Sequence, residues 1–230
     1  MYMRKSSIRN IRRAELSRAA FEAVVRYGLR KTTLEKVGDL AGVSKGVVLH
    51  HFKDKSSLLE AVFRRSNTVL TRSLVELYKH AESPFERLWA ILIANFSDAI
   101  YNRRVCQAWV SLAAEVPHSP QCQRIQTACN ARIHSNLRHE LKFFLSPEDA
   151  DRSARQLGVL IDGLWVRAGL DAQVLTSASA IAELEYAISK LLPADPDSVT
   201  QHKMARQKIE NVAYILMGSN AYKEQALQGS

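Results

Sequence analysis

A basic segment near the start of the chain has the residue types that bind phosphate groups. Residues 1–65 contain 15 Lys and Arg against 6 Asp and Glu, a net charge of +9, whereas residues 66–230 contain 17 of each kind. Such an asymmetry favours a polyanion, above all nucleic acid, as the partner of one small module. A basic solvated face without any partner is the alternative, and an anionic membrane surface is a weaker one.

A second candidate site combines a carboxylate with aromatic rings. Asp162 lies within an apolar run, where a carboxylate is costly to bury unless it is paired or meets a cation. Helical steps of four, three and four place it on one stripe with Gly158, Trp165 and Gly169. Such a stripe could form a cage for a quaternary ammonium ion through cation–π contacts. The candidate ligand-binding residues are Trp89, Phe96, Tyr101, Trp109, Asp162 and Trp165.

Other readings of this stripe stay open. Aromatic and apolar stripes in helical proteins usually form core, and Asp162 could pair with Arg132, Arg138 or Arg167. The glycines could instead let helices of two subunits approach closely.

Neither catalysis nor a cofactor has support in the sequence. The chain has no glycine-rich phosphate loop, no nucleophile elbow and no His or Cys spacing typical of a metal site. Its cysteines, Cys106, Cys122 and Cys129, are odd in number and are expected to pack in the interior as thiols. An all-helical enzyme with a basic substrate-binding end is therefore the weakest of the hypotheses.

The scarcity of helix breakers indicates how these residues are positioned. Glycine and proline together make 15 residues, where average usage of about 12% would give roughly 28. The chain is therefore expected to be all-α, with long helices and short loops. No run of eighteen apolar residues occurs, and the basic first ten residues lack the apolar stretch of a secretion signal, so we expect a cytoplasmic protein without a membrane span.

Residues 33–52 predict a helix-turn-helix. A first helix carries Leu16, Ala20, Ala23 and Tyr27 on its inward stripe and ends at Gly28. Thr33 and Ser44 can cap two short helices, with inward Leu34, Val37, Leu40 and Ala41 on the first of them and a tight turn at Gly42 between. Asp54 would cap a fourth helix. The residues left exposed for DNA are Ser44, Lys45, Gly46, Val47, Leu49, His50 and His51, with added charge from Lys53 and Lys55.

The residues after about position 80 are predicted to form further helices. Ser83-Pro84 and Ser146-Pro147 each combine a capping hydroxyl with a proline at the first helical position. Helices are predicted at about 85–101, 103–115, 120–144, 147–170 and 177–192. Residues 195–198 are expected to form a hinge or linker, residues 199–217 one more helix, and the polar end from Ser219 a disordered tail.

The run TTLEKVGDLAGVSKGVVLHHFKDKSSLLEAVF resembles the DNA-binding domain of TetR-family transcriptional repressors, and the likeness covers roughly residues 10–63. The resemblance implies phosphate contacts from Thr33, Ser44, His50 and Lys55, and base-edge contacts from Lys45, Gly46 and Val47. Two positions depart from the family pattern. Leu49 replaces a common tyrosine, and Val47 replaces a common threonine but could pack on a thymine methyl group.

Residues 88–170 resemble the BetI-type branch of that family, which responds to choline. The matching pieces are Asn95-Phe96, Ala108-Trp109, RIHSNLRHE at 132–140 and LIDGLWVRA at 160–168. Where the branch has a Phe-Trp pair, this chain has Leu112-Ala113.

These observations predict a ligand-responsive repressor. Residues 8–55 would form the DNA-binding domain, 56–193 an effector-binding and dimerisation domain, and 194–230 a linker with an extra helix or tail. The expected partners are double-stranded operator DNA with a palindromic sequence, a small-molecule effector and a second copy of the chain. The resemblance suggests that the helices near 147–170 and 177–192 pair between copies. A sensor of an unrelated hydrophobic molecule and an architectural DNA-binding protein without an effector are the alternatives.

Overall fold

A computed structural model describes residues 2–98, 100–171 and 175–218, and every regular element in these residues is a helix. The predicted all-α class is therefore confirmed. The elements are α1 (Tyr2–Tyr27), α2 (Leu34–Ala41), α3 (Lys45–His51), α4 (Lys55–Tyr78), α5 (Pro84–Ala94), α6 (Arg103–Ala113), a 3-10 turn (Val116–His118), α7 (Pro120–Leu141), α8 (Pro147–Leu170), α9 (Ser177–Leu191) and α10 (Pro196–Gly218).

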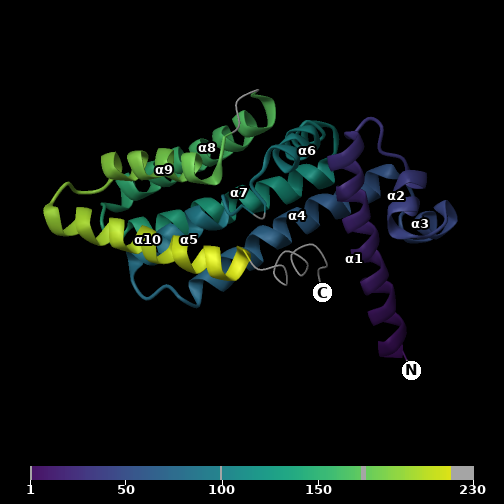
Figure 1. The fold of residues 1–230 in the computed structure, drawn as a ribbon, viewed down its shortest axis with the longest axis horizontal. Coiled ribbons are helices and arrows are strands. Elements are labelled where there is room, and N and C mark those ends of the chain that lie inside the picture. The colour runs from purple at the N-terminus through teal and green to yellow at the C-terminus, as the bar shows by residue number, and fades with distance from the viewer. Residues whose placement is uncertain (1, 99, 172–174, 219–230) are drawn as a thin grey trace.

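Helices α1 to α3 and the start of α4 form a unit at one end of the molecule (Figure 1). α1 ends before Gly28, whose φ of 75° lies in the left-handed region that glycine adopts without strain. Asp54 caps α4, because its carboxylate accepts a hydrogen bond from the backbone N–H of Ser57 at 2.7 Å. The buried core of this unit includes Leu16, Val37, Val48, Phe52 and Phe63.

Tyr27 departs from the predicted inward stripe of α1. Leu16 and Ala23 are buried, but Tyr27 is 39% exposed. Its ring lies against the ammonium group of Lys36, with Nζ 4.5 Å from the ring centroid. Val24, three residues earlier, fills the inward position of this last turn, so the phenol is directed to the surface.

Two Ser-Pro pairs begin helices in the larger part of the molecule, as predicted. The hydroxyl of Ser83 accepts a hydrogen bond from the N–H of Glu86 at 3.2 Å, and that of Ser146 accepts one from the N–H of Asp149 at 3.1 Å. A proline follows each serine at the first helical position. The backbone N–H that proline lacks has no hydrogen-bond partner within the helix at this position, so its absence costs nothing.

α5 ends well before its predicted end. The amide of Asn95 donates to the carbonyl oxygen of Ile91 at 2.7 Å, and the chain then leaves the helix. The loop turns Phe96 and Tyr101 into the interior, and the Tyr101 hydroxyl donates to the carbonyl oxygen of Leu164 at 3.0 Å. Burial of both rings therefore outweighs continuation of the helix. The predicted ends near residues 115 and 144 also lie beyond the observed ends of α6 and α7.

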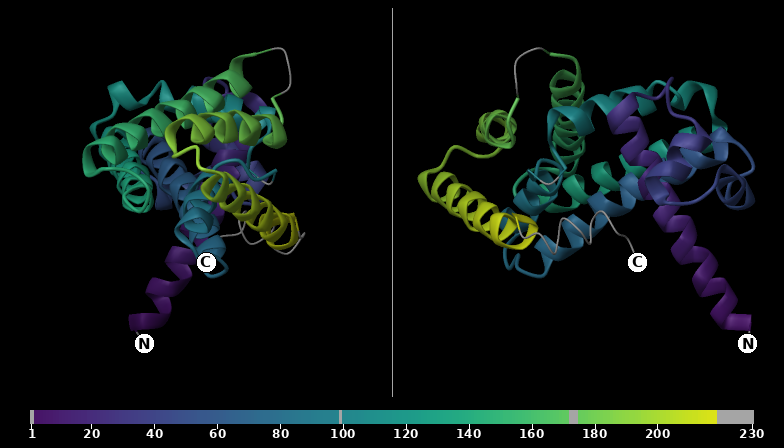
Figure 2. Two further views of the ribbon diagram at one scale, coloured as in Figure 1. Left: turned by 90° about the vertical axis from the view of Figure 1, so that its left-hand side faces the viewer. Right: turned by 45° about the vertical axis from the view of Figure 1, so that its right-hand side comes forward.

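Residues 195–198, predicted to be a hinge or linker, begin α10. The Asp195 carboxylate accepts a hydrogen bond from the N–H of Ser198 at 2.9 Å. α10 lies along α5 (Figure 2) and shares the core of the larger part. The disordered tail predicted from Ser219 falls outside the described residues. The buried residues of α10 are His202, Ala205, Ile209, Ala213 and Met217.

The N-terminal half of α1 projects from the rest of the molecule (Figures 1 and 2). The second half of α1 packs against α2, α4 and α6. Cys106, Cys122 and Cys129 are buried free thiols. Within the described ranges, no helix is both long enough and apolar enough to cross a bilayer.

Candidate functional site

The turn between α2 and α3 holds the two helices in close contact. Gly42 has φ 66° and ψ 33°, in the left-handed region. A Cβ at Gly38 would lie only 2.6 Å from the carbonyl oxygen of Val43, so this approach requires glycine. Ser44 begins α3, its hydroxyl accepting a hydrogen bond from the N–H of Val47 at 3.4 Å. The predicted helix-turn-helix is present.

Most residues predicted to face DNA are exposed. Thr33 and Ser44 cap α2 and α3 by accepting backbone N–H groups, and each hydroxyl keeps its own proton to donate to a phosphate oxygen. Val48 points into the core, so the residues on the opposite side of the helix face outward. The exposed residues of α3 are Lys45, Gly46, Val47, Leu49 and His50.

His51 and Lys55 are half-buried, so the prediction that His51 is exposed is wrong. Its backbone carbonyl accepts a hydrogen bond from Nη1 of Arg13 at 2.9 Å. Burial is the largest cause that lowers the pKa of the His51 imidazole, and the charge of His50 is the next largest. Nζ of Lys55 donates to the carbonyl oxygen of Leu29 at 2.9 Å and so ties α4 to the loop before α2.

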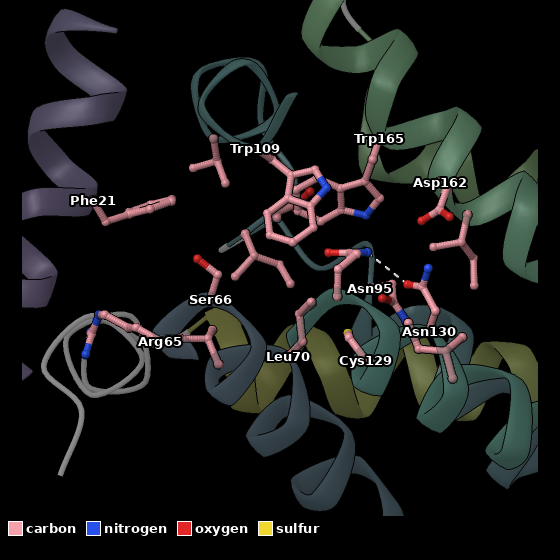
Figure 3. A pocket seen from close by; sticks show the side chains of 17 residues that line it. Phe21, Arg65, Ser66, Leu70, Asn95, Trp109, Cys129, Asn130, Asp162 and Trp165 are labelled. Carbon is pink, nitrogen blue, oxygen red and sulfur yellow. Dashed lines mark hydrogen bonds between the residues drawn. The ribbon is translucent and has the colours of Figure 1, made fainter. Parts of the chain in front are cut away.

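A cavity of about 270 Å³ lies between α4 and helices α6, α7 and α8 (Figure 3). Phe21 of α1 and the loop after α5 complete its wall. Apolar side chains predominate, and the polar groups include two carboxylates. The lining residues are Phe21, Arg65, Ser66, Val69, Leu70, Asn95, Asp98, Ile100, Val105, Trp109, Gln126, Cys129, Asn130, Ile133, Ile161, Asp162 and Trp165.

Two of the predicted cage rings face this cavity. The indoles of Trp109 and Trp165 have centroids 6.2 Å apart and planes at 63°. The Tyr101 ring meets Trp165 edge-on at 5.5 Å, and Phe96 packs edge-on against Tyr101 at 4.9 Å. Tyr101 and Phe96 are not in the wall, so they support the indole of Trp165 rather than touch the cavity.

Asp162 lines the same cavity from α8, beside Trp165 (Figure 3). The residue is exposed in this single chain, yet partial burial of its carboxylate raises the pKa of Asp162. None of its expected arginine partners pairs with it in the described part of the chain. Arg138 pairs with Asp151 at 3.4 Å, and Nη2 of Arg132 lies 3.6 Å from Sγ of Cys129. The carboxylate is therefore available to a cation in the cavity.

Trp89 lies elsewhere, so the prediction that it joins the cage is wrong. It is fully buried on α5, and its ring stacks on His202 of α10, with centroids 6.3 Å apart and planes at 12°. Its indole therefore packs α5 against α10. Hydrophobic burial at this helix contact outweighs the unmet hydrogen bond of its Nε1.

The two glycines of the predicted stripe have different surroundings. A Cβ at Gly169 would lie 2.8 Å from the carbonyl oxygen of Cys106, so Gly169 allows α8 to approach α6 within the same chain. A Cβ at Gly158 would meet no atom within 4 Å. Of these two glycines, Gly158 is therefore the one that could allow close approach of a second subunit.

Comparison with known proteins gives the family. Residues 16–62 match the model of bacterial regulatory proteins of the TetR family, and residues 84–193 match the model of the BetI-type transcriptional repressor C-terminal region. The HTH-type transcriptional regulator BetI of Pseudomonas aeruginosa PAO1 is 36% identical over 183 residues, which are 78% of this chain and 92% of the relative. The chain is a BetI-type member of the TetR family.

Further relatives agree with this membership. BetI of Yersinia pestis Pestoides F is 35% identical over 196 residues, 83% of this chain and 97% of the relative. A transcriptional regulator from Rhodococcus sp. RHA1 shares the fold with a TM-score of 0.69, at 23% identity over 78% of this chain and 95% of that one. A regulator from Saccharomonospora viridis, solved in complex with choline, has a TM-score of 0.67 at 19% identity, over 77% and 95%. The BetI-type chain is a DNA-binding transcriptional repressor and not an enzyme.

Sequence reasoning missed much of the cavity wall of this BetI-type repressor. Phe21, Arg65, Asn95 and Asp98 come from α1, α4 and the loop after α5, and Asn130 comes from α7. Periodicity along one helix does not show which faces of separate helices meet. The one available signal was a carboxylate, Asp98, four residues after the end of the apolar run 89–94.

Proposed function

We propose that this repressor binds a palindromic operator as a homodimer and leaves it when a small cation occupies the cavity beside Trp165. The supporting observation is the composition of the cavity wall, in which Phe21 of α1 and residues of α4 meet α8. A bound ligand would therefore touch the unit that reads DNA. An effector shifts an equilibrium only through its different affinity for two states, and direct contact with α1 and α4 gives it that difference.

The proposed DNA contacts fall into two kinds. α3 enters the major groove of each half-site, the half-sites being about 34 Å apart or a multiple of this distance. Lys45, Gly46 and Val47 face base edges, because they lie in the first turn of the exposed α3. The residues assigned to phosphates are Thr33, Ser44, His50 and Lys55, with Leu49 and His51 beside them.

The ligand class follows from the groups in the wall. Two indole faces and the carboxylates of Asp162 and Asp98 suit an ammonium ion with an apolar surface, such as choline. The choline complex of the S. viridis regulator supports this class. The cavity, at about 270 Å³, lies just below the range of roughly 300–1,000 Å³ typical of drug-sized ligands. Leu112 is buried in the core, so the residues that replace the branch's Phe-Trp pair add no ring to the cage.

Calorimetry with choline and with 3,3-dimethylbutanol, its uncharged isostere, tests the ligand class. We expect choline to bind more tightly, and Asp162→Asn to weaken choline binding by about tenfold, since the Coulomb attraction of a carboxylate for a cation about 4 Å away is worth roughly 1–4 kcal/mol near a protein surface. Glu148→Gln, which removes an exposed carboxylate from the same helix, should leave binding unchanged. Because the pKa of Asp162 is raised, choline affinity should fall as the pH falls toward that pKa.

Two outcomes would overturn parts of this proposal. Equal affinity for the two compounds would make the protein a sensor of uncharged apolar molecules. The DNA probe is a fluorescent duplex that the protein selects from a randomised pool. If choline binds the protein without releasing this duplex, choline is not the effector. The proposed domains, 8–55 and 56–193 with α10 packed on the core of the second, and the proposed cytoplasmic location are independent of both outcomes.

A further inference from the structure

The first half of α1 lies outside the family match, and the side chains described in it, residues 9–13, lie outside the hydrophobic core. The TetR-family match begins at residue 16, and between residue 9 and Ala19 the buried residues of the helix begin at Leu16. Residues 9–13 are all exposed, and this half projects from the molecule beside α3 (Figures 1 and 2). Exposed helix of this length is marginal on its own in water. A partner that covers it would stabilise it.

The projecting half carries only positive charge. Residues 2–13 include five basic residues and no acidic one. At 100° per residue, positions 9, 12 and 13 fall within about 100° of arc, so Arg9, Arg12 and Arg13 form one basic stripe along the helix. Arg12 also pairs with Glu15 of the next turn at 2.8 Å. The basic residues are Arg4, Lys5, Arg9, Arg12 and Arg13.

Arg13 joins this basic stripe to the end of α3. Its Nη1 donates to the carbonyl oxygen of His51 at 2.9 Å, and its guanidinium carbon lies 4.5 Å from the ring centroid of Phe52. The charges of Arg9 and Arg12 contribute with that of Arg13 to the lowered pKa of His51. The stripe therefore begins beside the helix that the proposed function places in the major groove.

We propose that the basic stripe on the projecting half of α1 binds DNA phosphates beyond the base pairs that α3 reads. This inference rests on the proposed function, because α3 must lie on the duplex for the stripe to reach the flanking phosphates. Residues 2–13 span about 18 Å of helix, roughly half a turn of DNA. A lipid surface would need a broad apolar face. The large apolar residues of this half occupy positions 2, 3, 8 and 11, which at 100° per residue are spread around the helix and form no single face.

Salt-dependent binding of the full-length protein tests the basic stripe. One probe is a duplex that the wild-type protein selects from a randomised pool, with one helical turn, about ten base pairs, of flanking DNA on each side. The second probe is the same duplex without flanks. The variant is Arg9→Gln/Arg12→Gln, which leaves the Arg13 contact with α3 intact. Lys79→Gln/Lys142→Gln is the matched control, because it removes two exposed charges at the ends of α4 and α7.

With the flanked duplex, we expect the variant to bind about tenfold more weakly and the slope of log affinity against log salt to fall by about two. With the trimmed duplex, and for the control, both values should equal those of the wild type. Equal slopes for variant and wild type on the flanked duplex would overturn the inference. Failure of the wild type to prefer any selected duplex over random DNA would instead overturn the proposed function. Loss of binding to vesicles of phosphatidylcholine and phosphatidylserine, with DNA binding intact, would make the stripe a membrane contact and overturn the inference.

Discussion

At the residue scale, Lys55 can serve the free protein and the DNA complex with one ammonium group. Its Nζ donates to the carbonyl oxygen of Leu29 at 2.9 Å, which leaves two N–H donors for a phosphate. We expect Lys55→Ala to weaken binding to every duplex sequence and to lower the salt slope by about one phosphate contact. Fluorescence anisotropy over a salt series measures both.

The lost bond to Leu29 should cost about 1 kcal/mol of unfolding free energy, which thermal unfolding reports separately. An unchanged salt slope in Lys55→Ala would show that Lys55 contacts no phosphate and only binds the loop before α2. Lys53→Ala removes an exposed charge two residues away and is the matched control for local electrostatics.

His202 should make the docking of α10 sensitive to pH. The side chain is 3% exposed and stacks on Trp89, and burial lowers its pKa from the ordinary 6.5 even though the Glu185 carboxylate opposes this. The unfolded chain therefore takes up a proton at a pH where the folded protein does not. The free energy of unfolding is therefore unaffected by protonation of His202 above pH 6.5. It decreases as the pH falls below 6.5 toward the lowered pKa, by at most about 1.4 kcal/mol per pH unit.

Thermal unfolding from pH 6.5 down to about 5 checks this behaviour. His202→Phe should flatten the decline in unfolding temperature, because phenylalanine takes up no proton. The matched change His118→Gln, at an exposed histidine, should leave the decline as in the wild type. Parallel curves for wild type and His202→Phe would contradict the assignment.

At the scale of elements, two glycines of the helix-turn-helix should respond oppositely to alanine. A Cβ at Gly38 would lie 2.6 Å from the Val43 carbonyl oxygen, so Gly38→Ala must force α2 away from the turn. We expect a loss of about 1–3 kcal/mol in stability. At Gly46 the nearest atom is the Ser44 hydroxyl oxygen at 3.7 Å, so Gly46→Ala should add up to about 1 kcal/mol through helix propensity.

Hydrogen exchange of the α2 and α3 amides distinguishes these two variants. Protection should fall in Gly38→Ala and persist in Gly46→Ala, whereas operator affinity should fall in both, because a methyl group at exposed Gly46 separates α3 from the groove. Equal protection in the two variants would contradict the proposed crowding at Gly38.

The elements also show where sequence reasoning succeeds. The caps Thr33, Ser44 and Asp54 were predictable, because each bonds an N–H only three residues away. The cage was only partly predictable. Trp89 and Trp165 both lie in apolar helices, and the packing of α10 over α5, which sequence periodicity did not indicate, decides which indole faces the cavity.

At the scale of the whole molecule, α8 carries a second apolar stripe that the described residues of the chain leave uncovered. Val159, Val166 and Leu170 are 73%, 43% and 68% exposed, and with Gly163 they follow steps of four, three and four. Exposed apolar stripes of this kind mark interaction surfaces. A second copy packed on this face would also cover Asp162, which is exposed in the single chain although it lines the cavity.

We therefore expect Val159→Glu to give a folded monomer. A carboxylate at this position would have to be buried between two copies of α8, which costs several kcal/mol per ion. Sedimentation should show the monomer, with circular dichroism unchanged. Operator affinity should fall by about 100-fold or more, because the two helix-turn-helix modules no longer bind as a linked pair. Choline affinity should fall as well, because Asp162 loses its cover.

Val75→Glu is the matched control for this change, since Val75 on α4 is 52% exposed and lies outside the stripe. It should remain dimeric with unchanged operator affinity. A dimeric Val159→Glu would place the interface elsewhere, and a monomeric wild type would contradict the dimer itself. If the variant is monomeric but keeps full choline affinity, the cavity is complete within one chain. The second copy would then serve only to place two α3 helices at the spacing of the operator half-sites.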